Sequence, residues 1–151
     1  MILLSLKIER RTVGAAIFHS RHLENTRKRE LSSDSEKASR TLTAFIRELV
    51  ETHHPALVAI EIPPQDCNTR RLVLTDTTRN LARSLGVPIR EVTKHEVFEA
   101  FTLPPCKNRK DLRSIVARIF PSVAEARTPS LLDAAALGLY VQTKQLLTPS
   151  P

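Results

Sequence analysis

The stretch that decides the fold is LVAIEIPP, Leu57–Pro64. Its first four residues are apolar, which is typical of a buried strand, and the two prolines at its end cannot continue the pairing of a sheet. Glu61 stands where the strand ends, although an unpaired charge is costly to bury. The position predicts either a functional carboxylate at the carboxyl end of the strand or a side chain that only reaches solvent there.

Three patterns that precede this stretch also predict strands. They cover Ile2–Lys7, Thr12–Phe18 and His22–Leu31, and the connections between them are short. Short connections between strands favour antiparallel hairpins, so these three should form a meander.

The rest of the chain alternates helices with strands. Apolar residues recur at helical spacing after a predicted capping box, Ser33-Asp34-Ser35-Glu36, and that helix should end near Pro55. After it we expect a helix over about Thr69–Leu85, closed by Gly86, and a strand over Val87–Val92. A capping box at Thr93–Glu96 should open a short helix that Pro104-Pro105 breaks. Two further helices should follow, opened by Asn108–Asp111 and by Ser130–Asp133. Strands reached through a helix should pair in parallel. The order predicts an α/β fold with a mixed five-stranded sheet and helices on both faces, in one domain over residues 1–147 with a short tail at 148–151.

Composition narrows the class of protein. The chain has 151 residues, a formal charge of +7 and two cysteines, Cys67 and Cys106, which are too few for a disulfide framework. No apolar run is long enough to span a membrane, so we expect a cytoplasmic protein. The positive charge suits a polyanionic partner such as nucleic acid, although it is also ordinary for solubility. The aromatic content of 4% argues against stacking of single-stranded bases.

The ordered set of elements resembles the ribonuclease H-like superfamily, and within it the RuvC-type Holliday junction resolvases. VAIEIPP resembles the strand that ends in a catalytic glutamate, KNRKDLRSIVARIF is similar to the lysine-bearing segment and its helix, and DAAALGLYV is similar to the C-terminal helix. The resemblance covers almost the whole chain. It implies a nuclease in which carboxylates hold two magnesium ions that activate water and stabilise the leaving oxygen.

One position departs from that pattern. Where the resemblance implies an aspartate that bridges both metals, the first strand ends in Lys7, and an ammonium group cannot ligate a metal. We predict that Lys7 occupies the former metal site and pairs with Glu61, Asp133 or both, within about 4 Å. Glu9 is an alternative ligand, because residues two apart on a strand share a face. The alternative for Lys7 is an ordinary exposed lysine.

The remaining catalytic candidates also have plain alternatives. Asp133 is either a metal ligand of the last helix or only completes a capping box that Ser130 opens three residues earlier, and Ala136 stands where a second aspartate can occur. Lys110 resembles a basic residue that assists at the scissile phosphate, and it can equally be a surface lysine. If a metal site survives, Glu61 and Asp133 would bind Mg²⁺ or Mn²⁺; otherwise no cofactor is needed.

Several basic residues are candidates for contacts with nucleic acid: Arg10, Arg11, Arg70, Arg71, Lys94 and Lys107.

The sequence and the resemblance leave three candidate functions. The first is a RuvC-like protein that binds branched or duplex DNA with weakened or absent nuclease activity. The second is an active metal-dependent endonuclease that resolves junctions with a rearranged ligand set. The third is a structural relative that binds proteins. The resemblance implies a homodimer, because a junction offers two equivalent strands.

Overall fold

The computed structural model describes residues 1–64, 67–100, 108–122 and 128–147. The elements are β1 (Ile2–Ile8), β2 (Thr12–His19), β3 (His22–Glu30), α1 (Ser35–His53), β4 (Leu57–Glu61), α2 (Thr69–Ser84), β5 (Ile89–Val92), α3 (Lys94–Ala100), α4 (Arg109–Ile119) and α6 (Pro129–Leu147). The predicted order of strands and helices is confirmed. The predicted tail at 148–151 and the break at Pro104-Pro105 lie outside the described residues.

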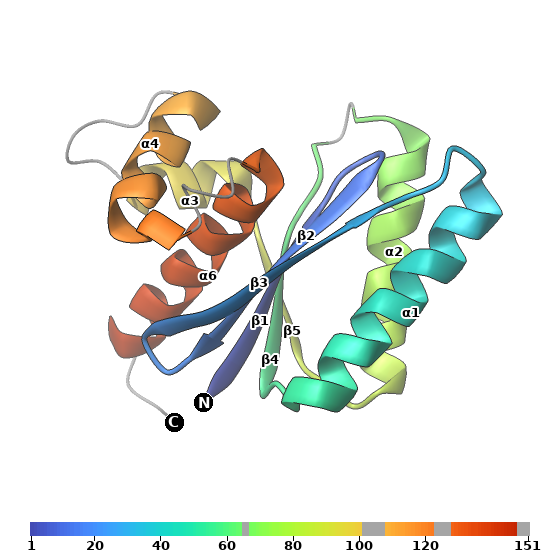
Figure 1. The fold of residues 1–151 in the computed structure, drawn as a ribbon, viewed down its shortest axis with the longest axis horizontal. Coiled ribbons are helices and arrows are strands. Elements are labelled where there is room, and N and C mark those ends of the chain that lie inside the picture. The colour runs from blue at the N-terminus through green and yellow to red at the C-terminus, as the bar shows by residue number, and fades with distance from the viewer. Residues whose placement is uncertain (65–66, 101–107, 123–127, 148–151) are drawn as a thin grey trace.

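The sheet is five-stranded, with the order β3-β2-β1-β4-β5 (Figure 1). β1 pairs antiparallel with β2, and β2 pairs antiparallel with β3, as the meander required. β4 lies parallel to β1 and β5 lies parallel to β4. The mixed sheet predicted from the sequence is therefore correct, and its central strand is β1.

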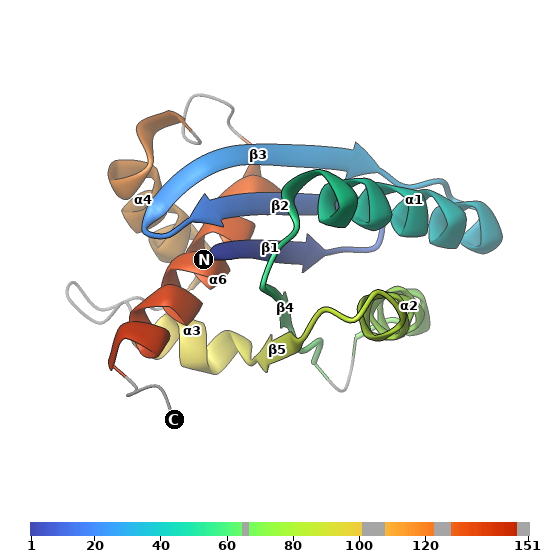
Figure 2. The same cartoon turned by 90° about the horizontal axis from the view of Figure 1, so that it is seen from below.

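Helices cover both faces of the sheet. α1 and α2 lie on one face, and α3, α4 and α6 lie on the other, as the two perpendicular views show (Figures 1 and 2). Because side chains alternate along a strand, the even-numbered residues of β1 face α1 and α2 while the odd-numbered ones face α6. Leu4 and Leu6 thus enter one core, and Leu3 enters the other.

Glycines at two positions allow helix α6 to approach the sheet closely. A Cβ atom on Gly14 would come within 2.7 Å of the carbonyl oxygen of Ser130, and one on Gly138 would meet the ring of Phe18 at 2.2 Å. The hydroxyl of Ser5 on β1 donates a 2.6 Å hydrogen bond to the carbonyl of Ala134. The N-terminal half of α6 is therefore held against β1 and β2.

Two helix starts differ from the sequence prediction. The cap of α1 is Asp34, which accepts a 2.9 Å hydrogen bond from the Lys37 amide, so the predicted box that starts at Ser33 is wrong by one residue. α6 begins at Pro129, a favoured first helical residue, so Asp133 lies in its second turn and is not part of a cap. In contrast, Thr93 and Glu96 exchange the two predicted capping hydrogen bonds, each 3.1 Å long.

Candidate functional site

The parallel register of β1 and β4 brings Lys7 and Glu61 together. Leu6 pairs with Ile60, so the next position along each strand places Lys7 beside Glu61. Both residues follow the alternation that points toward α6, and both stand at the carboxyl ends of their strands. A lysine and a glutamate far apart in the sequence therefore meet on the same face of the sheet.

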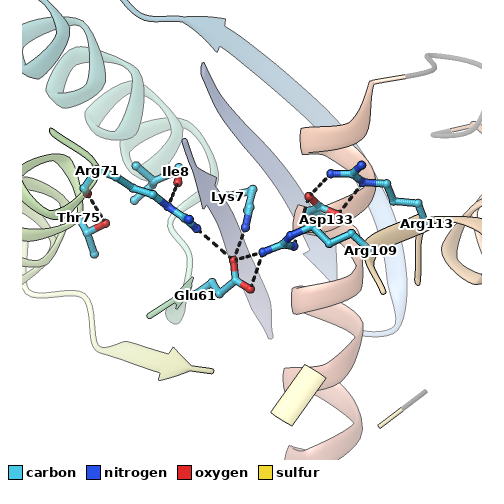
Figure 3. Close-up of polar contacts among 8 residues, drawn as sticks. All are labelled: Lys7, Ile8, Glu61, Arg71, Thr75, Arg109, Arg113 and Asp133. Carbon is cyan, nitrogen blue, oxygen red and sulfur yellow. Dashed lines mark hydrogen bonds and ion pairs between the residues drawn. The ribbon is translucent and has the colours of Figure 1, made fainter. Parts of the chain in front are cut away.

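Glu61 accepts contacts from three cations (Figure 3). The Lys7 ammonium donates to its Oε2 atom, as the sequence predicted. Arg109 Nη2 lies 3.1 Å from Oε1 and 3.2 Å from Oε2, and Arg71 Nη2 lies 3.4 Å from Oε2. Only 9% of the Glu61 side chain is exposed, so the alternative of a strand-end carboxylate that reaches solvent is wrong.

Asp133 is held by two arginines of α4. Arg113 forms a two-pronged contact, with Nε at 3.1 Å from Oδ1 and Nη2 at 2.9 Å from Oδ2. Arg109 Nη1 lies 3.5 Å from Oδ2. The hydrogen bond with Asp133 raises the pKa of the Arg113 guanidinium above its ordinary value. Arg109 therefore bridges the two carboxylates, which β4 and α6 supply separately.

We call these six residues the cation cluster: Lys7, Glu61, Arg71, Arg109, Arg113 and Asp133. Four of its side chains are cationic and two are anionic, so its formal charge is +2. The acids and Lys7 form an inner layer, with 9%, 2% and 4% of their side chains exposed, whereas the side chains of Arg109 and Arg113 are 26% and 30% exposed. Positive charge is thus in excess, and part of it faces solvent.

The pKa shifts follow from this arrangement. Burial lowers the pKa of the Lys7 ammonium, and the positive charges of Arg109 and Arg71 lower it further against the opposing effect of Glu61. For Glu61, burial alone would raise the pKa, but the charges of Lys7 and Arg109 outweigh burial and hold that pKa below its ordinary value of 4.5. Glu61 is therefore ionised at neutral pH.

Helix N-termini add to the positive potential at the cluster. Arg71 lies in the first turn of α2, and Arg109 is the first residue of α4. The backbone of Ser130, in the first turn of α6, lies close to Gly14, which is the partner of Lys7 on β2. Because helix N-termini carry a partial positive charge, the three helix starts increase the positive potential that the side chains create.

The cluster does not fit a two-metal centre. A small cavity of about 10 Å³ lies among Lys7, Glu61, Arg109 and Asp133, which is room for about one water molecule. Among the residues that the structure describes, no group of three or more histidine, cysteine or acidic residues is placed to share a metal ion. Instead, Glu61 carries charge-assisted contacts from Lys7 and two arginines, and Asp133 carries contacts from Arg109 and Arg113.

The remaining predicted site residues that the structure describes are not members of the cluster. Lys110 is exposed on α4, and Arg109, the residue before it, is the one that reaches Glu61. Arg10 and Arg11 are exposed in the turn after β1, and Lys94 is exposed with its ammonium 5.2 Å from the centre of the Phe98 ring. Lys107 lies outside the described residues. The charge of Glu9 acts on Arg113 and helps to raise the pKa of that guanidinium.

Arg70 and Arg71, both predicted to contact nucleic acid, bind within the chain. Arg70 donates to the carbonyl oxygens of Arg10 at 2.8 Å, of Ser33 at 2.7 Å and of Ser32. Arg71 donates to the carbonyl of Ile8 at 3.1 Å as well as to Glu61.

Sequence reasoning missed Arg109 and Arg113 as members of the site. A usable signal was present, because the two residues are four apart on a predicted helix and so share a face. The resemblance of this segment to a lysine-bearing element indicated Lys110 instead. The helix phase, and not the residue type, decides which side chain faces the sheet.

Comparison with known proteins uses structure, since no family model matches the chain and no curated protein matches it in sequence. The RuvC structure from Thermus thermophilus superposes with a TM-score of 0.81 at 16% identity, over 100% of this chain and 99% of that one. A Holliday junction resolvase from fowlpox virus gives 0.61 at 12% identity, over 95% and 99%. The yeast mitochondrial Holliday junction resolvase gives 0.63 at 7% identity, over 96% and 81%. The chain thus has the ribonuclease H-like fold of the RuvC-type Holliday junction resolvases.

Proposed function

We propose that this protein binds nucleic acid, with branched or duplex DNA as its substrate class, and that its nuclease activity is weakened or absent. The observation that carries the proposal is the pairing of Lys7 with Glu61 at the carboxyl ends of the two central strands. There, a tethered ammonium and two guanidinium groups contact the carboxylate that the resemblance assigns to a metal. A cation built into the chain supplies positive charge but no exchangeable ligand position for an attacking water.

DNA as the partner rests on charge and on relatives. The chain carries a formal charge of +7, and the Thermus thermophilus RuvC and the fowlpox virus resolvase have been solved with Holliday junction DNA. On this chain, exposed Arg10, Arg11 and Lys94 are the proposed surface contacts to phosphates. Arg70 and Arg71 would act by positioning the turn after β1 instead of by gripping phosphates, because their contacts are to backbone and to Glu61.

The direct test measures binding and cleavage of the same DNA. Fluorescence anisotropy with a four-way junction, a duplex and a single strand over a salt series should give salt-sensitive binding that is tightest for the junction. The R10Q/R11Q double variant should reduce the salt slope by about 2, because each phosphate contact contributes about 0.9. Incubation with Mg²⁺ or Mn²⁺ should leave the junction intact. Absence of binding to any nucleic acid at low salt would support the protein-binding alternative instead.

The second candidate is an active metal-dependent endonuclease with a rearranged ligand set. It is favoured by the position of Glu61 and Asp133, whose carboxylates lie near enough for one guanidinium, that of Arg109, to reach both. Cleavage of the junction in Mg²⁺ or Mn²⁺ that is lost in D133N would establish this candidate, provided that D133N still binds DNA.

Replacing Lys7 by aspartate tests whether the remaining residues of the site could still bind Mg²⁺. Lys7→Asp would remove the ammonium and add a third carboxylate on the same face, where Mg²⁺ prefers oxygen ligands. Because Arg109 also neutralises both acids, the K7D/R109Q double variant should bind Mg²⁺ more tightly than K7D in isothermal titration calorimetry. Absence of Mg²⁺ binding in both would mean that the remaining donors no longer form a site. A homodimer stays an expectation, which light scattering would test.

A further inference from the structure

The charge imbalance of the cation cluster has a cost that a bound anion would reduce. Four cations meet two carboxylates, and side-chain positive charge that is removed from water without a partner is unfavourable. The excess is located in the outer layer, where Arg109 and Arg113 keep about a quarter or more of their side chains exposed. A negatively charged group that docks there would complete the pairing.

The size of the inner cavity decides where such a group can sit. The cavity of about 10 Å³ beside Lys7 and Glu61 has room for about one water molecule, and not for a phosphate. A phosphate would therefore lie outside the inner layer and contact the solvent-facing sides of the arginines. The planar guanidinium group is well suited to this, because it presents paired N–H donors to phosphate oxygens.

Resting on the proposed function, we infer that the cation cluster binds the phosphodiester backbone of nucleic acid directly through Arg109 and Arg113, without a bridging metal ion. In this arrangement Glu61 and Asp133 do not ligate a metal. They orient the arginines, because each arginine is anchored on a buried carboxylate that fixes its position. The positive potential of the helix starts at α2, α4 and α6 acts in the same direction.

Arg109 is the best residue for a test because its removal leaves each acid with a partner. In R109Q, Glu61 keeps Lys7 and Arg71, and Asp133 keeps Arg113. Arg79 supplies a matched control, because it also contacts two carboxylates, those of Asp76 and Glu91, and its side chain is 28% exposed. R109K is the conservative variant, which keeps the charge and loses the planar fork.

The experiment is anisotropy of a labelled four-way DNA junction with excess EDTA or with Mg²⁺, over a salt series. The wild type should bind as tightly in EDTA as in Mg²⁺. R109Q should weaken binding by about 10- to 100-fold, as expected for the loss of a hydrogen bond to a charged group, and should reduce the salt slope by about 0.9. R79Q should match the wild type in affinity, and R109K should recover part of the loss and keep the wild-type salt slope. R113Q, which leaves Asp133 with Arg109, gives a second reading of the same site.

Two results would overturn the inference and leave the proposed function standing. One is binding that requires Mg²⁺, because a metal would then bridge the protein and the phosphate. The other is binding by R109Q and R113Q that equals binding by R79Q, because the DNA would then contact only other surfaces such as Arg10 and Arg11. A wild type that binds no nucleic acid at low salt in either buffer would overturn both.

Discussion

Helix α2 contributes arginines to two ion clusters that differ in almost every physical respect. Arg71 joins the cation cluster, and Arg79, two turns further along, pairs with Asp76 and Glu91. The first cluster has four cations, two acids and a nearly closed inner layer. The second has one cation and two acids, and its carboxylates are 65% and 38% exposed, so water already solvates its charges.

The two clusters differ because Glu61 and Glu91 lie one position out of register on the neighbouring strands β4 and β5. Ile60 pairs with Glu91 across β4 and β5, and Glu61 pairs with Val92. Since successive side chains point to opposite faces, Glu91 lies toward α2 and the open edge of the sheet, while Glu61 lies under α6 and α4. The face of the sheet on which a glutamate lies, and the helices that cover that face, therefore decide whether it is a solvated surface charge or a buried partner of several cations.

The largest expected effect is on the free energy of unfolding, when Glu61 and Glu91 are each replaced by glutamine. Glu61→Gln leaves Lys7, Arg71 and Arg109 beside a neutral amide, and an uncompensated buried charge costs about 3–5 kcal/mol. Glu91→Gln removes one partner of the half-buried Arg79, which keeps Asp76, and should cost at most about 1 kcal/mol. Urea denaturation of both variants measures the two losses. Equal losses would show that the cation cluster is as well solvated as the exposed one.

A substitution at Gly14 should disturb the buried cluster alone. In Gly14→Ala the new methyl group would stand 2.7 Å from the Ser130 carbonyl and push the start of α6, with Asp133, away from Lys7. Overpacking of this kind costs about 1–3 kcal/mol. Thermal unfolding gives the loss, and NMR shifts of the arginine side chains should change for Arg113 and stay constant for Arg79. A shift at Arg79 would mean that the disturbance is general.

Removal of a cation should cost less than removal of an anion. Lys7→Met keeps a similar volume, and Glu61 retains Arg71 and Arg109 as partners. We expect a change in the free energy of unfolding of about 1 kcal/mol or less, in contrast to E61Q. Urea denaturation measures it. If K7M proves as damaging as E61Q, then the arginines do not neutralise Glu61 and the excess of positive charge is only formal.

The smallest effect concerns the pH dependence of the stability that Glu61 contributes to the buried cluster. The charges of Lys7 and Arg109 hold the pKa of Glu61 below 4.5, whereas the unfolded chain takes up that proton near the ordinary value. The stability that this carboxylate contributes is thus present above about pH 4.5 and is lost as the pH falls through the lowered pKa of the folded state. Titration followed by carboxyl-carbon NMR should show Glu61 protonating below its ordinary value of 4.5. Protonation of Glu61 above that value would contradict the ion pairing.

The sequence allowed the order of elements along the chain, the meander and the parallel pairing to be predicted, because each depends on local pattern and on the length of the connections. The contact between Lys7 and Glu61 was predicted from the resemblance, which implies a shared site for the two positions. It did not reveal that Arg109 and Arg113 close the site. Their placement depends on how α4 rotates against α6 through Leu112 and Val116, which is a long-range packing outcome. Two cap positions were also misassigned, at Ser33 and Ser130, because a stronger or earlier helix-starting residue stood next to each.

Arg70, which the sequence suggested as a surface contact to nucleic acid, instead links parts of the chain that are far apart in the sequence. Its guanidinium ties α2 to the hairpin bend at Arg10 and to the connection that follows β3, at Ser32 and Ser33. One guanidinium thus donates hydrogen bonds to main-chain oxygens of two other segments and links them to α2. Since any residue type supplies such an oxygen, this contact depends on the Arg70 side chain and not on the side chains at Arg10, Ser32 and Ser33.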